Sequence, residues 1–390
     1  MTASRIPLSA YVHLPWCVRK CPYCDFNSHE VSGKGLPEDS YISALEADID
    51  LENSRGDQRN IETVFFGGGT PSLFSARGID RVLAAFTNEL GMEKDAEITL
   101  EANPGAVEAE RFSEYRRIGI NRLSIGVQSF NDEALAGLGR IHDSSEAVAA
   151  INIAQESGFD NLNIDLMHGL PGQDVTMALA DLQTAVRLRP PHISWYQLTL
   201  EPNTVFYSKP PSLPTHEQCW EIQQNGKALL ESEGYRQYEV SAWARDGMEC
   251  RHNLNYWQFA DYYGVGAGAH GKLSDTHEGE IKRYQRHRIP GIYMQKSRAG
   301  NAVARETRVS EEDLVLEFMM NSLRLLAGFS PGLFTERTGL DIGCIEHLLE
   351  QARSAGLLEW QENSIRASEK GMDFLNDLLA IFLPGVAKNE

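Results

Sequence analysis

Three cysteines near the start of the chain have a spacing that can hold a metal centre. Cys17, Cys21 and Cys24 are separated by three and then two residues, directly after a short apolar run. Three thiolates on one short loop can bind three irons of a [4Fe–4S] cluster and leave the fourth iron open to another ligand. The same thiolates together with His13 or His29 could instead bind a zinc ion. A redox-active Cys-x-x-Cys pair is a third interpretation, but no thioredoxin-like context surrounds it.

Short apolar runs alternate with amphipathic stretches through the first half of the chain. The stretch 40–51, for example, places Tyr41, Leu45 and Ile49 on one face of a helix. Strands that alternate with helices predict parallel pairing, because parallel neighbours need a crossover connection. Six such units without a clear dinucleotide-binding fingerprint predict an α/β fold with a partial (β/α)6 barrel. The runs are Tyr11–Leu14, Val64–Phe66, Ile98–Leu100, Leu123–Val127, Leu162–Met167 and Ile193–Leu200.

Glycines and polar residues follow these predicted strands directly. Examples are Gly67–Thr70, Glu101–Pro104, Gln128 and Asp165. In a βα barrel the C-terminal ends of the strands meet at one rim, where the functional site is built. A single acidic residue at such a position often only caps the next helix. Because several strand ends carry such residues beside the cysteines, the pattern predicts one ligand site.

The second half of the chain has a different pattern. We predict a helix over 216–234, then strands and loops rich in Tyr, Trp and Gly up to residue 273. Residues 306–390 are predicted to form helices followed by a hairpin, a small domain similar to a winged helix. That part has 7 basic and 15 acidic residues, which argues against DNA binding. The predicted parts are a core over 1–235, a β and loop extension over 236–305, and a C-terminal helical domain over 306–390.

Composition sets broad limits on the class of protein. The 390 residues are 42% hydrophobic and 23% charged, values typical of a folded globular chain rather than a disordered or collagenous one. A formal net charge of −19 argues against binding nucleic acid. The first residues do not resemble a secretion signal, and no apolar run is long enough to span a membrane. We therefore expect a cytoplasmic chain, where clustered thiols bind metal rather than form disulfides.

The motifs together resemble those of one known superfamily. The segment Tyr11–Cys24 is similar to the cluster loop of radical S-adenosylmethionine (SAM) enzymes, and in particular to the oxygen-independent coproporphyrinogen III oxidase family. The likeness covers roughly residues 10 to 200 in register, and the C-terminal part is also similar. The further matching motifs are Gly67–Pro71, Glu101–Pro104, Ser124–Phe130 and Asn163–Gly172.

The resemblance implies two cofactors. Cys17, Cys21 and Cys24 would bind a [4Fe–4S] cluster whose open iron chelates SAM, and the family uses the reduced cluster to cleave the sulfonium bond. By position, the residues that would bind SAM or flank the cluster are Tyr11, Tyr23, Gly68, Gly69, Thr70, Glu101, Gln128, Arg140 and Asp165.

Two departures argue against the oxidase activity. The oxidase has a fourth cysteine two positions after the third, where this chain has Phe26, and it has a longer segment before its cluster loop. Both departures resemble the heme chaperones of the same family. The resemblance therefore implies heme binding and heme transfer to respiratory membrane proteins, with the decarboxylase as the alternative. The resemblance favours a role other than catalysis and leaves the decarboxylase as an open alternative.

A motif in the second half supports the chaperone branch. His252–Trp257 matches the H-N-x-x-Y-W signature associated with heme binding in those chaperones. An imidazole can ligate heme iron, and Tyr256 and Trp257 can stack on a flat apolar ring. The alternative is a structural histidine beside packed aromatic residues. Cys250 and His270 are two further candidates for the axial ligand.

One basic stretch interrupts the acidic chain. Residues 282–298 contain six Lys or Arg and no acidic residue. Such a stretch could receive the propionates of heme, or contact anionic lipids or a partner protein. A peripheral contact with the inner membrane is compatible with this pattern. If the chain is a heme chaperone, as the resemblance implies, its cluster and SAM would be regulatory or structural, for example by controlling dimerisation or heme release, so a homodimer is also expected.

Overall fold

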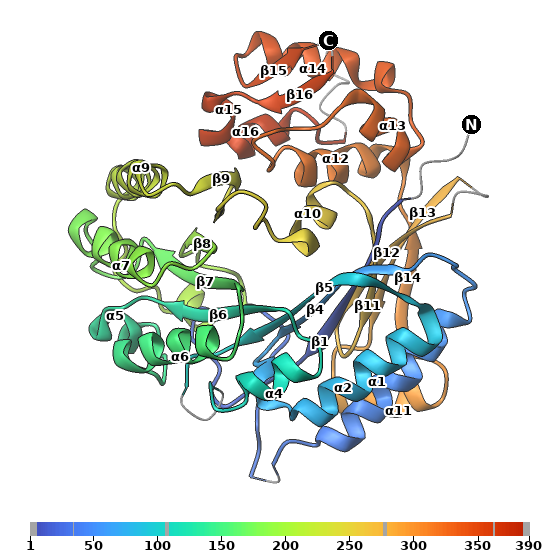
Figure 1. Cartoon of the computed structure of the whole chain (residues 1–390). Coiled ribbons are helices and arrows are strands. Elements are labelled where there is room, and N and C mark those ends of the chain that lie inside the picture. Colours follow the sequence, from blue (N-terminus) through green and yellow to red (C-terminus); the bar gives the residue numbers. More distant parts are fainter. Residues whose placement is uncertain (1–5, 34, 106–108, 276–278, 362, 385–390) are drawn as a thin grey trace.

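A computed structural model describes residues 6–33, 35–105, 109–275, 279–361 and 363–384. Its centre is a twelve-stranded mixed sheet in the order β14-β13-β12-β11-β1-β4-β5-β6-β7-β8-β10-β9, which curves around an interior flanked by helices (Figure 1). Six neighbouring strands in this sheet are parallel and alternate with helices, so the predicted α/β partial barrel is confirmed. These strands are β1 (Leu8–Leu14), β4 (Ile61–Gly68), β5 (Met92–Ala102), β6 (Arg122–Gln128), β7 (Asn161–His168) and β8 (His192–Gln197).

The parallel strands form because they are covered on both faces. Ala10, Val12, Val64 and Phe66, for example, are fully buried, as is typical of strands packed between a barrel interior and surrounding helices. The helices of the barrel are α1 (Glu38–Asn53), α2 (Ala76–Ala85), α4 (Phe112–Arg117), α5 (Asp132–Gly137), α6 (Ser144–Glu156), α7 (Val175–Arg187) and α9 (His216–Ser232).

The sheet continues beyond the six parallel strands on both sides. Next to β1 lies β11 (Asp261–Val265), which is also parallel, followed by the antiparallel strands β12 (His270–Asp275), β13 (Glu280–Arg286) and β14 (Val303–Arg308). The antiparallel strands β10 (Ala242–Ala244) and β9 (Arg236–Glu239) extend the other side. The site region also contains β2 (Trp16–Cys17), β3 (His29–Glu30), α8 (Val205–Ser208) and α11 (Pro290–Arg298).

One expectation for the extension is wrong. The predicted strands and loops up to residue 273 include a helix, α10 (Arg251–Trp257), which carries the H-N-x-x-Y-W motif. Its buried residues His252 and Asn255 are three positions apart, so they lie on the same helix face. That spacing belongs to a helix rather than to the two-residue alternation of a strand.

The C-terminal part has its own apolar core. Phe318 packs edge-on against both Phe329 and Phe334, and against Phe259, which follows α10 in the chain. Phe259 thus joins the extension to the C-terminal part. The elements of this part are α12 (Glu311–Ser322), α13 (Pro331–Thr338), α14 (Glu346–Ser354), the hairpin β15 (Leu358–Gln361) and β16 (Ser364–Ala367), α15 (Glu369–Asp373) and α16 (Leu375–Ala380).

The basic stretch does not form one cationic face. Arg286 is completely buried and pairs with Asp48 and Glu52 of α1. Arg283 pairs with Glu317 of α12 at 2.5 Å. Ion pairs with acidic residues of α1 and α12 therefore neutralise part of the positive charge of this stretch.

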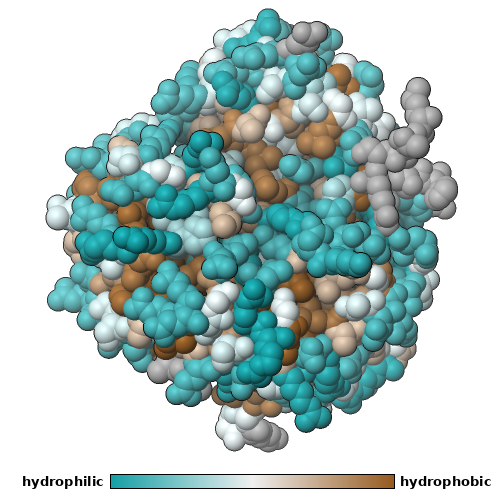
Figure 2. Space-filling model, in the orientation of Figure 1, coloured by the Kyte–Doolittle hydropathy of each residue, from teal (hydrophilic) through white to brown (hydrophobic). Residues whose placement is uncertain are grey.

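One face of the molecule is mostly hydrophilic. On the face shown in Figure 2, hydrophilic residues cover most of the surface, and the hydrophobic areas are separate patches. No helix among the described residues is long and apolar enough to cross a membrane.

Candidate functional site

The three clustered cysteines lie on one loop that folds back on itself. The loop begins and ends at the short parallel pair β2 and β3, where Trp16 pairs with His29. Inside it, the Cys24 amide donates a hydrogen bond to the Cys21 carbonyl at 3.1 Å. The thiols of Cys17, Cys21 and Cys24 all line one cavity of about 280 Å³ at the ends of the barrel strands.

The geometry around the loop bears on the zinc interpretation. Among the residues that the structure describes, no three His, Cys, Asp or Glu side chains converge to hold one metal ion. His13 already uses both ring nitrogens, with the Tyr11 hydroxyl at 3.0 Å and the Asn27 carbonyl at 2.9 Å. A single zinc ion needs all its sulfur ligands about 2.3 Å away. Thiolates that each bind a different iron of a cluster can stand farther apart.

The glycine motif brings strand β4 close to this loop. The Gly69 amide donates to the Leu14 carbonyl at 2.8 Å. A Cβ on Gly69 would lie 2.5 Å from the Trp16 carbonyl oxygen, and one on Gly68 would lie 2.5 Å from the His13 ring. Gly68 also has a φ of 119°, which glycine adopts most readily. The glycines are therefore required first by the packing of β4 against the cluster loop.

Two carboxyl groups lie where β5 and β7 reach the cavity. The Gly68 amide donates to Glu101 at 3.1 Å, while the Ser124 hydroxyl and the Asn163 amide donate to Asp165 at 2.9 and 2.8 Å. Burial, followed by the nearby Asp165, raises the pKa of Glu101 to about 8. Burial also raises the pKa of Asp165, against the effect of its hydrogen-bond donors. These neighbouring acids therefore favour protonation when no ligand is present.

Gln128 and Arg140 line the same cavity as the glycine motif. Gln128 is a non-glycine residue with a φ of 70°, at a bulge that ends β6. Its side-chain oxygen accepts a hydrogen bond from the Tyr196 hydroxyl at 2.8 Å. Arg140 donates to the Gly126 carbonyl and to Asn103, both at 2.7 Å, and approaches the Cys21 sulfur at 3.7 Å. The positive φ of Gln128 is a strained backbone conformation, and such strain is typical of residues that are held in place for function.

The structure brings most of the predicted site residues together. Two of them, Tyr11 and His252, instead line a second cavity of about 800 Å³ inside the barrel. Glu101, Asp165 and Phe26 border both cavities, so the two adjoin. The predicted residues that line the smaller cavity are Cys17, Cys21, Tyr23, Cys24, Gly68, Gly69, Thr70, Glu101, Gln128, Arg140 and Asp165.

Among the residues of the smaller cavity that sequence reasoning missed, three hydrogen-bond to predicted site residues through their side chains. Asn103 lies within the quoted motif after β5, but its bonds to Thr70 at 3.0 Å and to Arg140 appear only in the fold. Ser124 also lies in a quoted motif and holds Asp165. Tyr196, at the end of β8, had only its strand-end position to mark it.

The larger cavity has an aromatic and partly cationic wall. Tyr256, Trp257 and Tyr262 line it, as do Arg122 and Arg288. Its volume of about 800 Å³ is within the range of about 300–1,000 Å³ that holds a small molecule or cofactor. The cavity can therefore take a large flat ligand that carries negative charge.

Comparisons with known proteins agree with this arrangement. Residues 11–184 match the radical SAM superfamily model, and residues 309–374 match the HemN C-terminal domain model. The chain is 47% identical to the heme chaperone HemW of Escherichia coli, covering 97% of this chain and 98% of that protein. It is 34% identical to the heme chaperone HemW of Bacillus subtilis, covering 96% and 99%. Coproporphyrinogen III oxidase HemN of Escherichia coli, a radical SAM enzyme, is similar in structure with a TM-score of 0.82 and 26% identity, covering 97% of this chain and 90% of that one.

Proposed function

Because the chain belongs to the HemW family within the radical SAM superfamily, we propose that it is a heme chaperone that binds heme in the larger cavity and passes it to respiratory membrane proteins. The observation that supports this most is the cavity of about 800 Å³ beside the cysteine site, with aromatic side chains on its wall. A flat porphyrin stacks well on aromatic rings, and its propionates favour nearby cations.

The superfamily implies a [4Fe–4S] cluster and SAM, and the donor set in the smaller cavity fits both. Cys17, Cys21 and Cys24 would ligate three irons, and Glu101 and Asp165 would accept hydrogen bonds from SAM. The Arg140 guanidinium would keep the loop placed through its contacts with Gly126 and Cys21. When bound, a reduced cluster supplies an electron to SAM.

The alternative function is the oxidative decarboxylation of coproporphyrinogen III. It is favoured by the full-length structural likeness to HemN. Against it stands Phe26, 60% exposed at the border of both cavities, in place of the oxidase's fourth cysteine. Heme delivery at the inner membrane, a homodimer and cytoplasmic location stay predictions of the sequence.

One experiment separates the two functions. The chain, purified without oxygen, is titrated with heme and also incubated with coproporphyrinogen III, SAM and a reductant. We expect saturable binding of about one heme per chain and no protoporphyrinogen above a control without protein. Protoporphyrinogen formed over many turnovers would refute the chaperone assignment and support the oxidase. Heme transfer is then tested with a heme-depleted respiratory cytochrome in vesicles.

We also expect SAM binding to depend on pH through Glu101. An ionised carboxylate accepts hydrogen bonds better than a protonated one. With a pKa of about 8, affinity should rise about tenfold from pH 7 to pH 9. Stability of the free chain should change in the opposite direction. The raised pKa stabilises the protonated fold, so this contribution is complete below about pH 4 and is lost as the pH rises toward 8.

Calorimetry and thermal unfolding of the wild-type chain and of Glu101→Gln check both parts. Glu101→Gln should lose both the rise of SAM affinity with pH and the fall of stability with pH. Subtracting the results of the variant from those of the wild type removes the titration of the ligand's own amino group. Equal pH dependence in the two proteins would contradict a role for this carboxyl group.

A further inference from the structure

The structure distinguishes three side chains that could ligate heme iron. Cys250 is completely buried and its thiol donates to Glu97 at 3.6 Å. His252 is 1% exposed, and both its ring nitrogens are engaged, with Thr63 at 2.7 Å and Tyr256 at 3.2 Å. An axial ligand needs an unengaged nitrogen or sulfur that faces the ligand. Neither residue meets this condition as it stands.

His270 meets it. This residue begins β12, is exposed, and lines the larger cavity together with Tyr256 and Trp257. Its ring forms no hydrogen bond or ion pair with any residue that the structure describes. Burial, and then Arg283 and Arg288, lower the pKa of His270, which favours the neutral imidazole. Neutral imidazole is the form that binds a metal.

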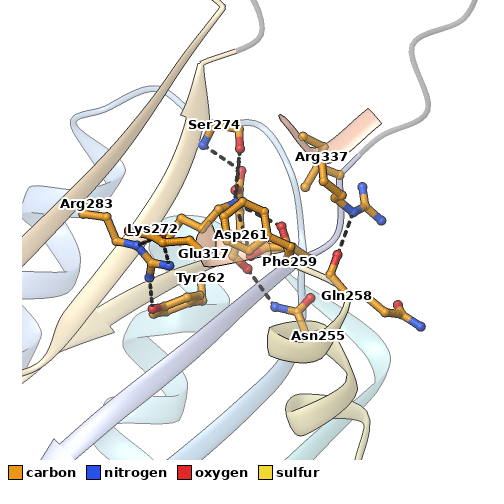
Figure 3. A network of polar contacts seen from close by, with 12 residues as sticks. Asn255, Gln258, Phe259, Asp261, Tyr262, Lys272, Ser274, Arg283, Glu317 and Arg337 are labelled. Carbon is orange, nitrogen blue, oxygen red and sulfur yellow. Dashed lines mark hydrogen bonds and ion pairs between the residues drawn. The ribbon is translucent and has the colours of Figure 1, made fainter. Parts of the chain in front are cut away.

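The wall around His270 is held by a buried polar network. Lys272, two residues further along β12, donates to Asp261 at 2.9 Å and to the Phe259 carbonyl at 3.1 Å (Figure 3). Ser274 donates to Asp261 through both its amide and its hydroxyl. Lys272 and Asp261 are 1% and 0% exposed, so their charges are shielded from water and satisfied by each other. The network fixes β12 against β11 and leaves no spare donor on Lys272 for a ligand.

The same network reaches the motif helix. Asn255 of α10 donates to the Asp261 carbonyl at 3.0 Å, and Arg337 of α13 donates to the Gln258 carbonyl at 3.2 Å (Figure 3). The helix and the strand that face the cavity are therefore held in place before a ligand arrives. Such a supporting shell is what a defined ligand geometry requires.

We propose that His270 is the axial ligand of the heme iron and that His252 is a positioning residue, which holds Tyr256 in the cavity wall. This inference rests on the proposed heme-binding function and adds the ligand to it. Iron would take one lone pair from a nitrogen of the neutral imidazole, so no bond to another group has to break. Arg288, which is exposed and also lines the cavity, is available to a propionate.

Imidazole rescue tests the assignment. Ferric heme is added to the wild-type chain, to His270→Gly and to His270→Cys, and the absorption and electron paramagnetic resonance spectra are recorded. His270→Gly should lose the wild-type spectrum and regain it with free imidazole, with heme affinity reduced at least tenfold before rescue. His270→Cys should give a thiolate-type spectrum. His287→Gly is the matched control, since His287 is close in the chain but does not line the cavity, and its spectrum should equal that of the wild type.

The outcomes separate this inference from the proposed function. If the wild-type chain binds no heme, the chaperone assignment fails and the ligand assignment with it. If the wild type binds heme and both His270 variants keep its spectrum, only the ligand assignment is overturned. His252→Gln should keep the wild-type spectral type while binding heme less tightly. A changed ligand type in that variant, restored by imidazole, would assign the iron to His252 instead.

Discussion

Replacing Cys21 by Ser should remove the iron–sulfur cluster. A cluster with an open iron depends on three protein thiolates, so losing one leaves two irons without a protein ligand. Iron and sulfide should fall from roughly four of each per chain to below one, together with loss of the brown absorption. Cys17→Ser and Cys24→Ser should behave in the same way, because all three thiols line the same cavity.

The control for this loss is Cys344→Ser. Cys344 is exposed in the C-terminal part and distant in sequence from the cluster loop, so its replacement should leave iron and sulfide unchanged. Metal analysis by mass spectrometry after anaerobic reconstitution measures both. One zinc per wild-type chain with no sulfide would contradict the cluster and support the zinc site.

Replacing Arg122 by Gln should weaken heme binding by about 10- to 100-fold. Arg122 is 2% exposed, begins β6 and lines the larger cavity. Its side chain forms no hydrogen bond or ion pair within the described part of the chain, and its Nε is buried without a partner. Burial disfavours the charged guanidinium, and the nearby Glu97 and Asp165 offset part of that cost. A ligand carboxylate would offset that cost, and a hydrogen bond to a charged group contributes about 1.5–3 kcal/mol.

The dimethyl ester of heme isolates this charge. It keeps the ring and the iron but lacks both carboxylates, so wild-type chain and Arg122→Gln should bind it equally. Arg305→Gln, an exposed arginine on β14, is the matched control and should bind heme like the wild type. Equal affinity of the wild type for heme and for its ester would show that Arg122 has no carboxylate partner.

The grouping of the cysteines with the strand-end residues could be predicted largely from the sequence. The spacing of Cys17, Cys21 and Cys24 places three thiols on one loop whatever the surrounding fold does. The residues after successive strands converge because parallel strands end at one rim of a barrel. Eleven predicted residues consequently line one cavity. The packing role of the glycines could not be predicted in this way, since His13 and Trp16 occupy the space beside Gly68 and Gly69 only in the folded chain.

The larger cavity depended on contacts between distant parts of the chain. The motif residues His252 to Trp257 were expected among strands and loops, yet they form a helix whose histidine bonds Thr63. A cationic face was one of the roles left open for the basic stretch over 282–298, but Arg283 and Arg286 pair with α12 and α1. Neither partner can be identified from sequence separation or local pattern.

The sequence by itself determined the partial barrel, the family and the placement of three cysteines on one loop, because strand periodicity and motif spacing are local properties of the chain. The tertiary structure alone decided which histidine has hydrogen-bond partners on its ring and which has none among the described residues. Both His252 and His270 carry an imidazole, and their chemistry differs only through neighbours. Thr63 and Tyr256 are hydrogen-bonded to the two ring nitrogens of His252, while His270 lines the larger cavity. Hydrogen-bond partners and burial arise only when β4, α10 and β12 pack together.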